Sequence, residues 1–491
     1  MIGVIDTGTL AWIAVALPAA STVAIMLARR YRDVREGITM ATSATTFVIV
    51  ALLTLPVLLG DRPTVTLAIP IHGLPIKLTL EPLGMLFALV ASLLWIVTSI
   101  YSIGYMRANN EENQTRYYAF FAIAIASALG VAFAGNMFTL FIFYEALTIS
   151  TYPLVTHHGT DEARRAGRTY LGLLLGTSIA FQLLAIVWTW VAADTLDFVP
   201  GGILEGHVGG AALIVLLLLY VYGIGKAALM PLHRWLPAAM VAPTPVSALL
   251  HAVAVVKAGV FTVLKVIIYI FGIDLLAQTS GSQILVWLAG TTIIVASLVA
   301  LGQDNLKRRL AYSTVSQLSY VVLGAAILAP ISVAGAAIHI AAHALGKITL
   351  FFVAGAIHTS AHKTLVSELD GIGRRMPWTM AAFTIGTLSM IGLPPTFGFI
   401  SKWFMLEGAL ATEQFVPVAV IVLSTLLNAA YFLPIVYRAF FKAPPQGSPS
   451  HGEAPLPMTM ALLATAGGTV LFFFAPSIPG ILSFMAAGSI P

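Results

Sequence analysis

Ionisable side chains recur inside long apolar stretches of this 491-residue chain. Lys226 and Lys257 flank a proline-rich break at positions 231–245, and Lys402 follows a second break at a Pro-Pro pair. A lysine at bilayer depth costs about 2.5–3.5 kcal/mol on insertion scales, so such residues mark functional sites by default. Three lysines beside two helix breaks therefore predict a site that binds or moves protons or other cations.

Glu145 is the acid that lies most clearly within an apolar run, in the segment FYEALT. Burial disfavours the charged form of a lysine, whereas a nearby carboxylate favours it. We therefore expect Glu145 to pair with Lys226 and to control whether that lysine holds a proton. The alternative is a static ion pair between two helices, although a buried pair is weak evidence of net stabilisation.

His339, His343 and Lys347 are spaced by four residues in a second apolar run. Side chains at this spacing share one face of a helix. His358 lies close to the same stripe, about 28 Å further along at 1.5 Å per residue. Because histidine titrates near neutral pH, the stripe predicts a proton relay. A zinc ion held by the His-x3-His pair is the rival interpretation, but the face carries no cysteine or carboxylate.

His251 and Lys257 are six residues apart, so they face different sides of one helix. We expect His251 to lie nearer the histidine stripe, and its alternative role is a structural hydrogen bond between helices. Lys265 lies near the end of the same apolar run. Its long side chain is expected to extend to the membrane interface.

The composition identifies the class of protein. Hydrophobic residues make up 59% of the chain and charged residues 9%, whereas about a quarter of a soluble domain is charged. The chain is therefore expected to be a polytopic protein in a lipid bilayer. The absence of cysteine excludes disulfides and thiolate metal sites. The net charge of +5 does not predict a nucleic-acid partner, because the basic residues follow the membrane topology.

Hydrophobic runs long enough to cross the bilayer predict about fourteen transmembrane helices, of which the seventh and twelfth are broken. The first, near residues 9–28, is interpreted as a retained helix, not a signal peptide. Among the predicted connections, nearly all arginines and lysines lie in the odd-numbered ones, and only Arg62 and Lys77 lie in the even-numbered ones. The positive-inside rule then places both termini outside a bacterial or archaeal cytoplasmic membrane.

The two breaks are five helices apart, which is the arrangement expected of inverted repeats. We therefore divide the all-α chain into N-terminal helices 1–3 (1–116), a first five-helix repeat (117–271), a second, inverted repeat (283–441), and a C-terminal loop and helix 14 (442–491). The sequence contains no phosphate-binding loop, dinucleotide fingerprint or cysteine cluster. No catalytic, metal or cofactor residue is predicted, so energy must come from an ion gradient or a partner.

The motifs together resemble a known family. These are FYEALT, the segment from Tyr222 to Gly259, DNLKRRLAYSTVSQLSY, HALGKITLFF and GLPPTFGFISKWFML. They resemble the antiporter-like membrane subunits shared by respiratory complex I, membrane-bound hydrogenases and Mrp-type multisubunit cation/proton antiporters. The resemblance covers roughly residues 80–440 and implies fourteen helices, two inverted five-helix repeats and a proton route through a central chain of ionisable residues.

The resemblance also implies roles and partners. Glu145 resembles the family's paired carboxylate, Lys226 its partner lysine, Lys257 the central lysine and Lys402 the terminal lysine. The relay between them corresponds to His251, His339, His343 and Lys347. The lysine in FISKWF resembles the D-type member of Mrp antiporters, which implies other membrane subunits as partners and transport of protons and Na+. A proton-pumping subunit of complex I or a hydrogenase is the first alternative, and a subunit of an inorganic-carbon uptake complex is the second.

Overall fold

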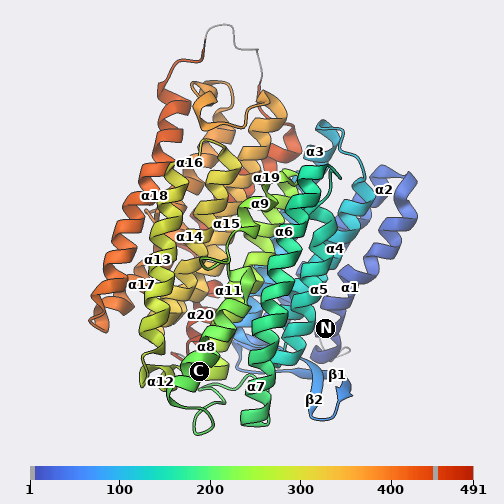
Figure 1. Ribbon diagram of the computed structural model, residues 1–491. Coiled ribbons are helices and arrows are strands. Elements are labelled where there is room, and N and C mark those ends of the chain that lie inside the picture. The colour runs from blue at the N-terminus through green and yellow to red at the C-terminus, as the bar shows by residue number, and fades with distance from the viewer. Residues whose placement is uncertain (1–5, 446–451, 490–491) are drawn as a thin grey trace.

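The computed structural model describes residues 6–445 and 452–489 of the chain. Long helices run side by side through the molecule, and a single β-hairpin lies at one end of them (Figure 1). Within the described residues, eleven helices are long and apolar enough to cross a membrane, and two shorter apolar helices accompany them. The protein is thus a nearly all-α membrane protein, as the sequence predicts.

The first five long helices and the hairpin precede the first break. Their bounds are α1 (Thr7–Leu27), η1 (Ala28–Arg30), α2 (Arg32–Leu58), β1 (Thr64–Ile71), β2 (Leu74–Thr79), α3 (Pro82–Ala108), α4 (Gln114–Ala132) and α5 (Met137–Val155). The strands are antiparallel, with Thr64 opposite Thr79 and Ile71 opposite Leu74. The sequence analysis did not predict this hairpin.

The next part of the chain is the most irregular. Its elements are α6 (Asp161–Thr177), η2 (Ser178–Gln182), α7 (Leu183–Ala193), α8 (Gly210–Gly223), η3 (Gly225–Ala227), α9 (Trp235–Ala238), η4 (Ala239–Val241), α10 (Thr244–Ala248), η5 (Leu249–Val253), α11 (Val255–Lys265), η6 (Val266–Phe271) and α12 (Ile273–Ala277). The segments η2, η5 and η6 are wider π-helical turns within otherwise continuous helices. The seventh predicted span is therefore broken after α8, as expected.

The remaining elements include the second break. They are α13 (Gly281–Leu301), α14 (Leu306–Ala326), α15 (Pro330–Ala361), η7 (Val366–Glu368), η8 (Ile372–Arg374), α16 (Pro377–Ile391), α17 (Phe397–Ala411), α18 (Phe415–Phe441), α19 (Leu456–Phe474) and α20 (Ser477–Ala486). The twelfth predicted span is divided into α16 and α17, again as expected. Part of the predicted C-terminal loop lies outside the described residues.

Local sequence explains where several helices begin and end. The side chains of Asn136, Thr160 and Asn305 accept hydrogen bonds from backbone N–H groups in the first turns of α5, α6 and α14. Such caps satisfy donors that a helix start leaves unpaired. Gly392 ends α16 with φ of +89°, a left-handed conformation that favours glycine. These signals fix the lengths of the helices that carry the site.

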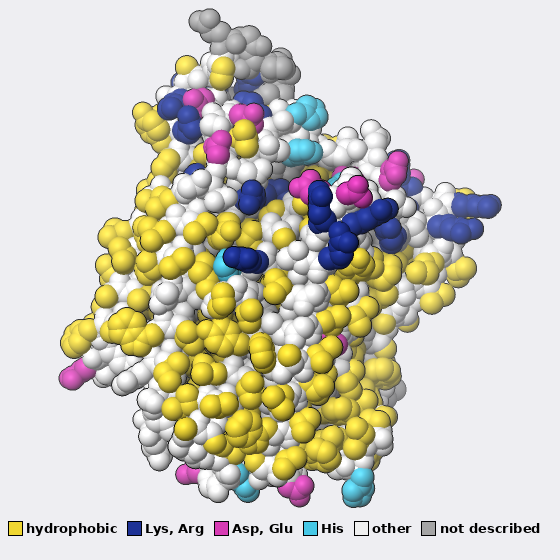
Figure 2. All heavy atoms as spheres, viewed as in Figure 1, with side chains coloured by type: hydrophobic (Ala, Val, Ile, Leu, Met, Phe, Trp, Pro, Cys, Tyr) yellow, Lys and Arg dark blue, Asp and Glu magenta, His cyan; other side chains and the backbone are white. Residues whose placement is uncertain are grey.

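Two helices form the centre of the molecule. The apolar windows of α15 and of the segment Thr244–Phe271 are fully buried by other helices, whereas those of α1, α18 and α19 are largely exposed. Figure 2 shows an apolar belt around the molecule and a concentration of Lys and Arg side chains toward the end opposite the hairpin. We call these ends the basic face and the hairpin face. Both the start of α1 and the end of α20 lie toward the hairpin face (Figure 1).

Candidate functional site

Lys226 lies in the unwound segment that follows α8. Its side chain is fully buried, and Nζ donates to the Tyr144 carbonyl oxygen at 2.8 Å and to Thr148 Oγ1 at 2.6 Å. The ammonium also lies 3.0 Å from the centroid of the Tyr144 ring. Lys226 is thus held against one face of α5, and the helix break makes this possible by turning the chain toward that helix.

Glu145 does not make the direct contact with Lys226 that the sequence predicts. Within the described residues, no ion pair joins the two, and both Glu145 carboxylate oxygens lack a hydrogen-bond partner. Lys226 instead contacts the residues one position before and three positions after Glu145. The carboxylate is still the opposite charge that acts on Lys226 through space. The pair is therefore separated but electrostatically coupled.

Gly259 of α11 allows the broken segment to approach. A Cβ atom there would lie 2.3 Å from the Lys226 carbonyl carbon and 2.4 Å from the Ala227 nitrogen. Any side chain would therefore push the lysine away from α5. The sequence places this glycine two residues after Lys257, so one short stretch of α11 contacts the first lysine and carries the central one.

Lys257 begins a series of contacts across three helices. Its Nζ lies 2.5 Å from His343 Nδ1 on α15, and both side chains are almost fully buried. The His343 ring stacks on His339, with centroids 5.9 Å apart. His339 Nδ1 in turn lies 2.8 Å from Ser401 Oγ on α17. The four-residue spacing read from the sequence is therefore confirmed as a shared face, and its partners come from α11 and α17.

Lys402 completes the series. Its Nζ donates to the carbonyl oxygens of Met390 at 2.8 Å and Ile391 at 3.1 Å, at the end of α16. The ammonium lies 4.5 Å from the centroid of the Tyr320 ring, whose other neighbour is His339 at 5.6 Å between centroids. Lys257, His343, His339 and Lys402 thus form one continuous cluster, which we call the central series.

Lys347 and His251 lie beside the central series. Lys347 is one turn beyond His343 on α15, and its Nζ donates to Ser313 Oγ. His251 packs on Phe351 with ring centroids 4.7 Å apart, and neither of its ring nitrogens has a hydrogen-bond partner among the described residues. His358 is exposed, so the stripe on α15 ends before it and does not extend over the length that the spacing suggests.

Lys265 differs from its sequence-based prediction. It does not extend to the interface, because its side chain is fully buried and forms an ion pair with Glu81, the residue before α3. The two residues are far apart in sequence, so no local pattern signals their contact. Glu407, in contrast, is exposed on α17 and contributes nothing to the buried network.

Three polar residues of α14 contribute to the site and were not selected from the sequence. Ser313 contacts Lys347, Gln317 donates to the Met390 carbonyl oxygen at 3.3 Å, and Tyr320 lies between His339 and Lys402. Their spacings of four and three place them on one helix face. A polar stripe in a membrane helix is a signal that could have identified them.

A cavity of about 1020 Å³ opens at the basic face. Its wall includes Glu111, whose Oε2 lies 3.8 Å from nitrogens of both His157 and His158. Burial raises the pKa of the Glu111 carboxyl, and burial lowers the pKa of His157 to about 4. Titratable groups therefore surround an open space that water can fill from this face.

The arrangement is suited to moving protons. Lysine and neutral histidine can each accept a proton and pass it on, and donor–acceptor contacts of 2.5–2.8 Å join successive members of the series. Burial keeps these groups from exchanging freely with bulk water. The site residues expected from the sequence therefore fall into a Lys226–Glu145 region and the central series, with Lys347 and His251 adjacent to the latter.

Comparisons with known proteins agree with this geometry. The profile of a family described as NADH:quinone oxidoreductase/Mrp antiporter, TM, matches residues 134–428. NADH-quinone oxidoreductase subunit N of Desulforudis audaxviator is 35% identical, over 78% of this chain and 76% of its own length. Hydrogenase-4 component B of Escherichia coli is 31% identical, over 83% and 64%. The D-type Na(+)/H(+) antiporter subunit of Alkalihalophilus pseudofirmus is 28% identical, over 74% and 73%.

The fold is also found in a solved structure. A chain in the structure of the Mrp complex from Dietzia sp. superposes with a TM-score of 0.86, at 20% sequence identity. The alignment covers 98% of this chain and 97% of the other. At this identity the likeness establishes the fold, including the path of the broken helices, and the assignment of individual residues depends on the geometry above.

Proposed function

Since the chain belongs to the NADH:quinone oxidoreductase/Mrp antiporter transmembrane family, we propose that it is a proton-translocating subunit of a multisubunit monovalent cation/proton antiporter. The observation that carries the proposal is the central series, in which Lys257, His343 and His339 connect α11 to α17 beside Lys402. Protons move along this series, and Na+ is the cation exchanged for them by the whole complex.

Lys226 and Glu145 act in this proposal as the controlling pair. Because they are not in contact, the charge of Glu145 can change without breaking a hydrogen bond that holds Lys226. Loss of the carboxylate charge weakens the ammonium form of the buried lysine, which then releases its proton toward α11. Lys347 and His251 supply further titratable positions beside the path.

The membrane orientation follows from the basic residues. Arginine and lysine side chains gather at the face opposite the hairpin (Figure 2). The positive-inside rule assigns that face to the cytoplasm of a bacterial or archaeal cell, with the termini outside. The cavity beside Glu111 then opens to the cytoplasm.

The test is coupled transport by the whole complex in membrane vesicles. Lys257→Ala should abolish sodium-dependent proton movement while the subunits still co-purify, because the variant interrupts the central series at its first contact. Lys442, in the connection after α18, has a side chain that is 42% exposed and provides a matched control, so Lys442→Ala should transport at the wild-type rate. Full coupled transport by Lys257→Ala would contradict the proposal.

A redox-driven proton pump is the second candidate. One observation favours it: the identity to NADH-quinone oxidoreductase subunit N is 35%, compared with 28% to the D-type Na(+)/H(+) antiporter subunit. The gently purified complex distinguishes the two, because a redox complex carries iron–sulfur or flavin absorbance and an antiporter does not. The central series would serve proton movement in either complex.

A further inference from the structure

A second cavity, of about 490 Å³, opens at the hairpin face. Its wall combines the lead-in to the hairpin, the residue before α3, the loop after α7, the end of η6 and the chain after α20. The wall residues that matter here are Arg62, Thr79, Glu81, Phe198, Tyr269 and Asp274. Neither the sequence analysis nor the proposed function assigns a role to this cavity.

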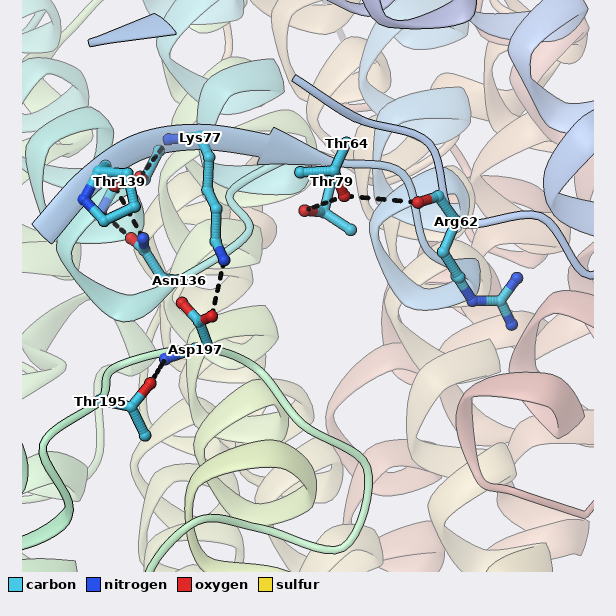
Figure 3. A network of polar contacts seen from close by, with 9 residues as sticks. Arg62, Thr64, Lys77, Thr79, Asn136, Thr139, Thr195 and Asp197 are labelled. Carbon is cyan, nitrogen blue, oxygen red and sulfur yellow. Dashed lines mark hydrogen bonds and ion pairs between the residues drawn. The ribbon is translucent and has the colours of Figure 1, made fainter. Parts of the chain in front are cut away.

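The hairpin holds the rim of the cavity in place. Thr64 Oγ1 lies 3.0 Å from Thr79 Oγ1 and bonds to the backbone oxygen of Arg62, which fixes the two sides of the rim (Figure 3). On the neighbouring side, Lys77 forms an ion pair of 2.7 Å with Asp197 of the loop after α7. The opening therefore has walls fixed by specific contacts.

An ion pair lies at the floor of this cavity. Glu81 lines the cavity with only 7% of its surface exposed, and its Oε1 accepts a hydrogen bond from the fully buried Nζ of Lys265. Two buried charges lose much of their hydration, and well-packed apolar residues of similar volume often stabilise a protein equally well. Fold stability alone therefore gives a weak reason for this pair, and one of its members reaches an open space.

Aromatic rings surround the ammonium on its other sides. Nζ of Lys265 lies 3.9 Å from the Phe198 ring centroid, 4.9 Å from that of Tyr269 and 5.8 Å from that of Phe261. Ring faces stabilise a cation without supplying a second proton acceptor. Glu81 is accordingly the acceptor to which the proton of Lys265 can pass, and Arg62, Tyr269 and Asp274 are the other titratable or charged groups facing the pair.

The pair lies on the helix that carries the central series. Lys257 and Lys265 are eight residues apart on α11, which corresponds to about 12 Å along the axis at 1.5 Å per residue. Lys257 contacts His343 at one end of this helix, and Lys265 contacts Glu81 at the other. The distance is short enough for a chain of a few water molecules.

We propose that Glu81 and Lys265 form the port through which the proton path exchanges protons with the aqueous phase at the hairpin face. In the outward direction Lys265 gives a proton to Glu81, and the neutral carboxylic acid releases it to water in the cavity. The neutral amine of Lys265 is then reprotonated from the Lys257 side, so that both groups regain their starting charge. This inference rests on the proposed function and adds a route that the central series lacks.

Substitutions test whether the pair transports or only supports the fold. The double variant Glu81→Gln with Lys265→Met removes both charges at nearly constant volume and leaves no buried charge unpaired. It should co-purify with the complex but transport at less than a tenth of the wild-type rate. Glu205→Gln, which alters an exposed carboxylate in the loop between α7 and α8, is the control and should transport normally. A double variant that transports at the wild-type rate would refute the port.

The wild-type complex provides a second measurement that does not depend on a variant folding. A water-soluble carbodiimide applied from the hairpin side activates carboxyl groups that water reaches, and a contacting lysine then forms an amide with loss of water. We expect a Glu81–Lys265 cross-link in peptide mass spectra, accompanied by loss of transport. The Lys77–Asp197 pair on the same face is the positive control. Cross-linking of the control pair without cross-linking of Glu81 would show that the floor is closed.

The two proposals fail in different ways. If Lys257→Ala abolishes transport while the double variant transports normally, the central series stands and the port is wrong. If Lys257→Ala transports normally, the proposed function itself is wrong.

Discussion

Gly259 provides a strict test of whether the position of Lys226 matters for transport. In Gly259→Ala the new methyl group would begin 2.3 Å from the Lys226 carbonyl carbon, whereas ordinary contacts of a Cβ atom start at about 3.4 Å. The unwound segment must therefore move by about 1.1 Å or more. The neighbouring atoms are backbone, so a side-chain rotation cannot relieve the clash.

The expected loss follows from the hydrogen bonds of Lys226. A displacement of that size away from α5 lengthens the 2.6 Å bond to Thr148 and the 2.8 Å bond to the Tyr144 carbonyl beyond hydrogen-bond range. Hydrogen bonds to charged groups contribute about 1.5–3 kcal/mol each. Loss of about 3 kcal/mol at the step that uses Lys226 corresponds to roughly a hundredfold slower transport.

The assay is sodium-dependent proton movement in vesicles that contain the whole complex, followed with a pH-sensitive dye. Gly172→Ala is the matched control, because a Cβ atom there meets nothing within 4 Å on α6. It should transport at the wild-type rate, and both variants should assemble. Wild-type transport by an assembled Gly259→Ala complex would refute the assignment of Lys226 to the transport path.

Three further predictions concern other parts of the structure. Ser401→Ala removes the partner of His339 Nδ1, which should cost about 1 kcal/mol and slow transport about fivefold without loss of assembly, as measured in the vesicle assay. Gly392→Ala places a Cβ atom 2.7 Å from Lys402 Cδ at a φ of +89°, so the melting temperature of the purified complex should fall and transport should be impaired. Because burial lowers the pKa of His157 to about 4, folding favours its neutral form, and the contribution to stability that is complete above pH 6.5 is lost as the pH falls toward 4. The melting temperature of the wild type should therefore fall over this range, and His157→Asn should show a shallower decline.

The sequence predicts the membrane architecture well because each span is a local feature. The apolar runs, the alternation of basic connections and the prolines at two sites lead to the long helices and both breaks. The hairpin was missed, although TVTLAIPI and LPIKLT alternate and enclose the turn glycine Gly73, whose φ is +81°. Attention to period-two alternation in the connection after α2 would have identified it.

The site was predicted less completely because its partners lie on different helices. The spacing of His339 and His343 defines a helix face, but it does not show which neighbour that face contacts. Rotation of each helix about its axis decides that Lys226 contacts Thr148 and not Glu145, and that Lys265 meets Glu81. Packing of α11 against α3, where the rings of Phe261 and Phe87 meet, buries the long side chain of Lys265 that hydropathy alone would place at the interface.

The end of α16 explains how so many lysines can lie in an interior with few acids. The Met390 and Ile391 carbonyl oxygens belong to the last turn of that helix, where carbonyls have no partner further along the chain. The peptide dipoles of a helix sum to about half a negative charge at this end. Lys402 is therefore balanced by a fixed partial charge that neither titrates nor moves. Its protonation state can then respond to its mobile neighbours without leaving a carboxylate stranded in the membrane.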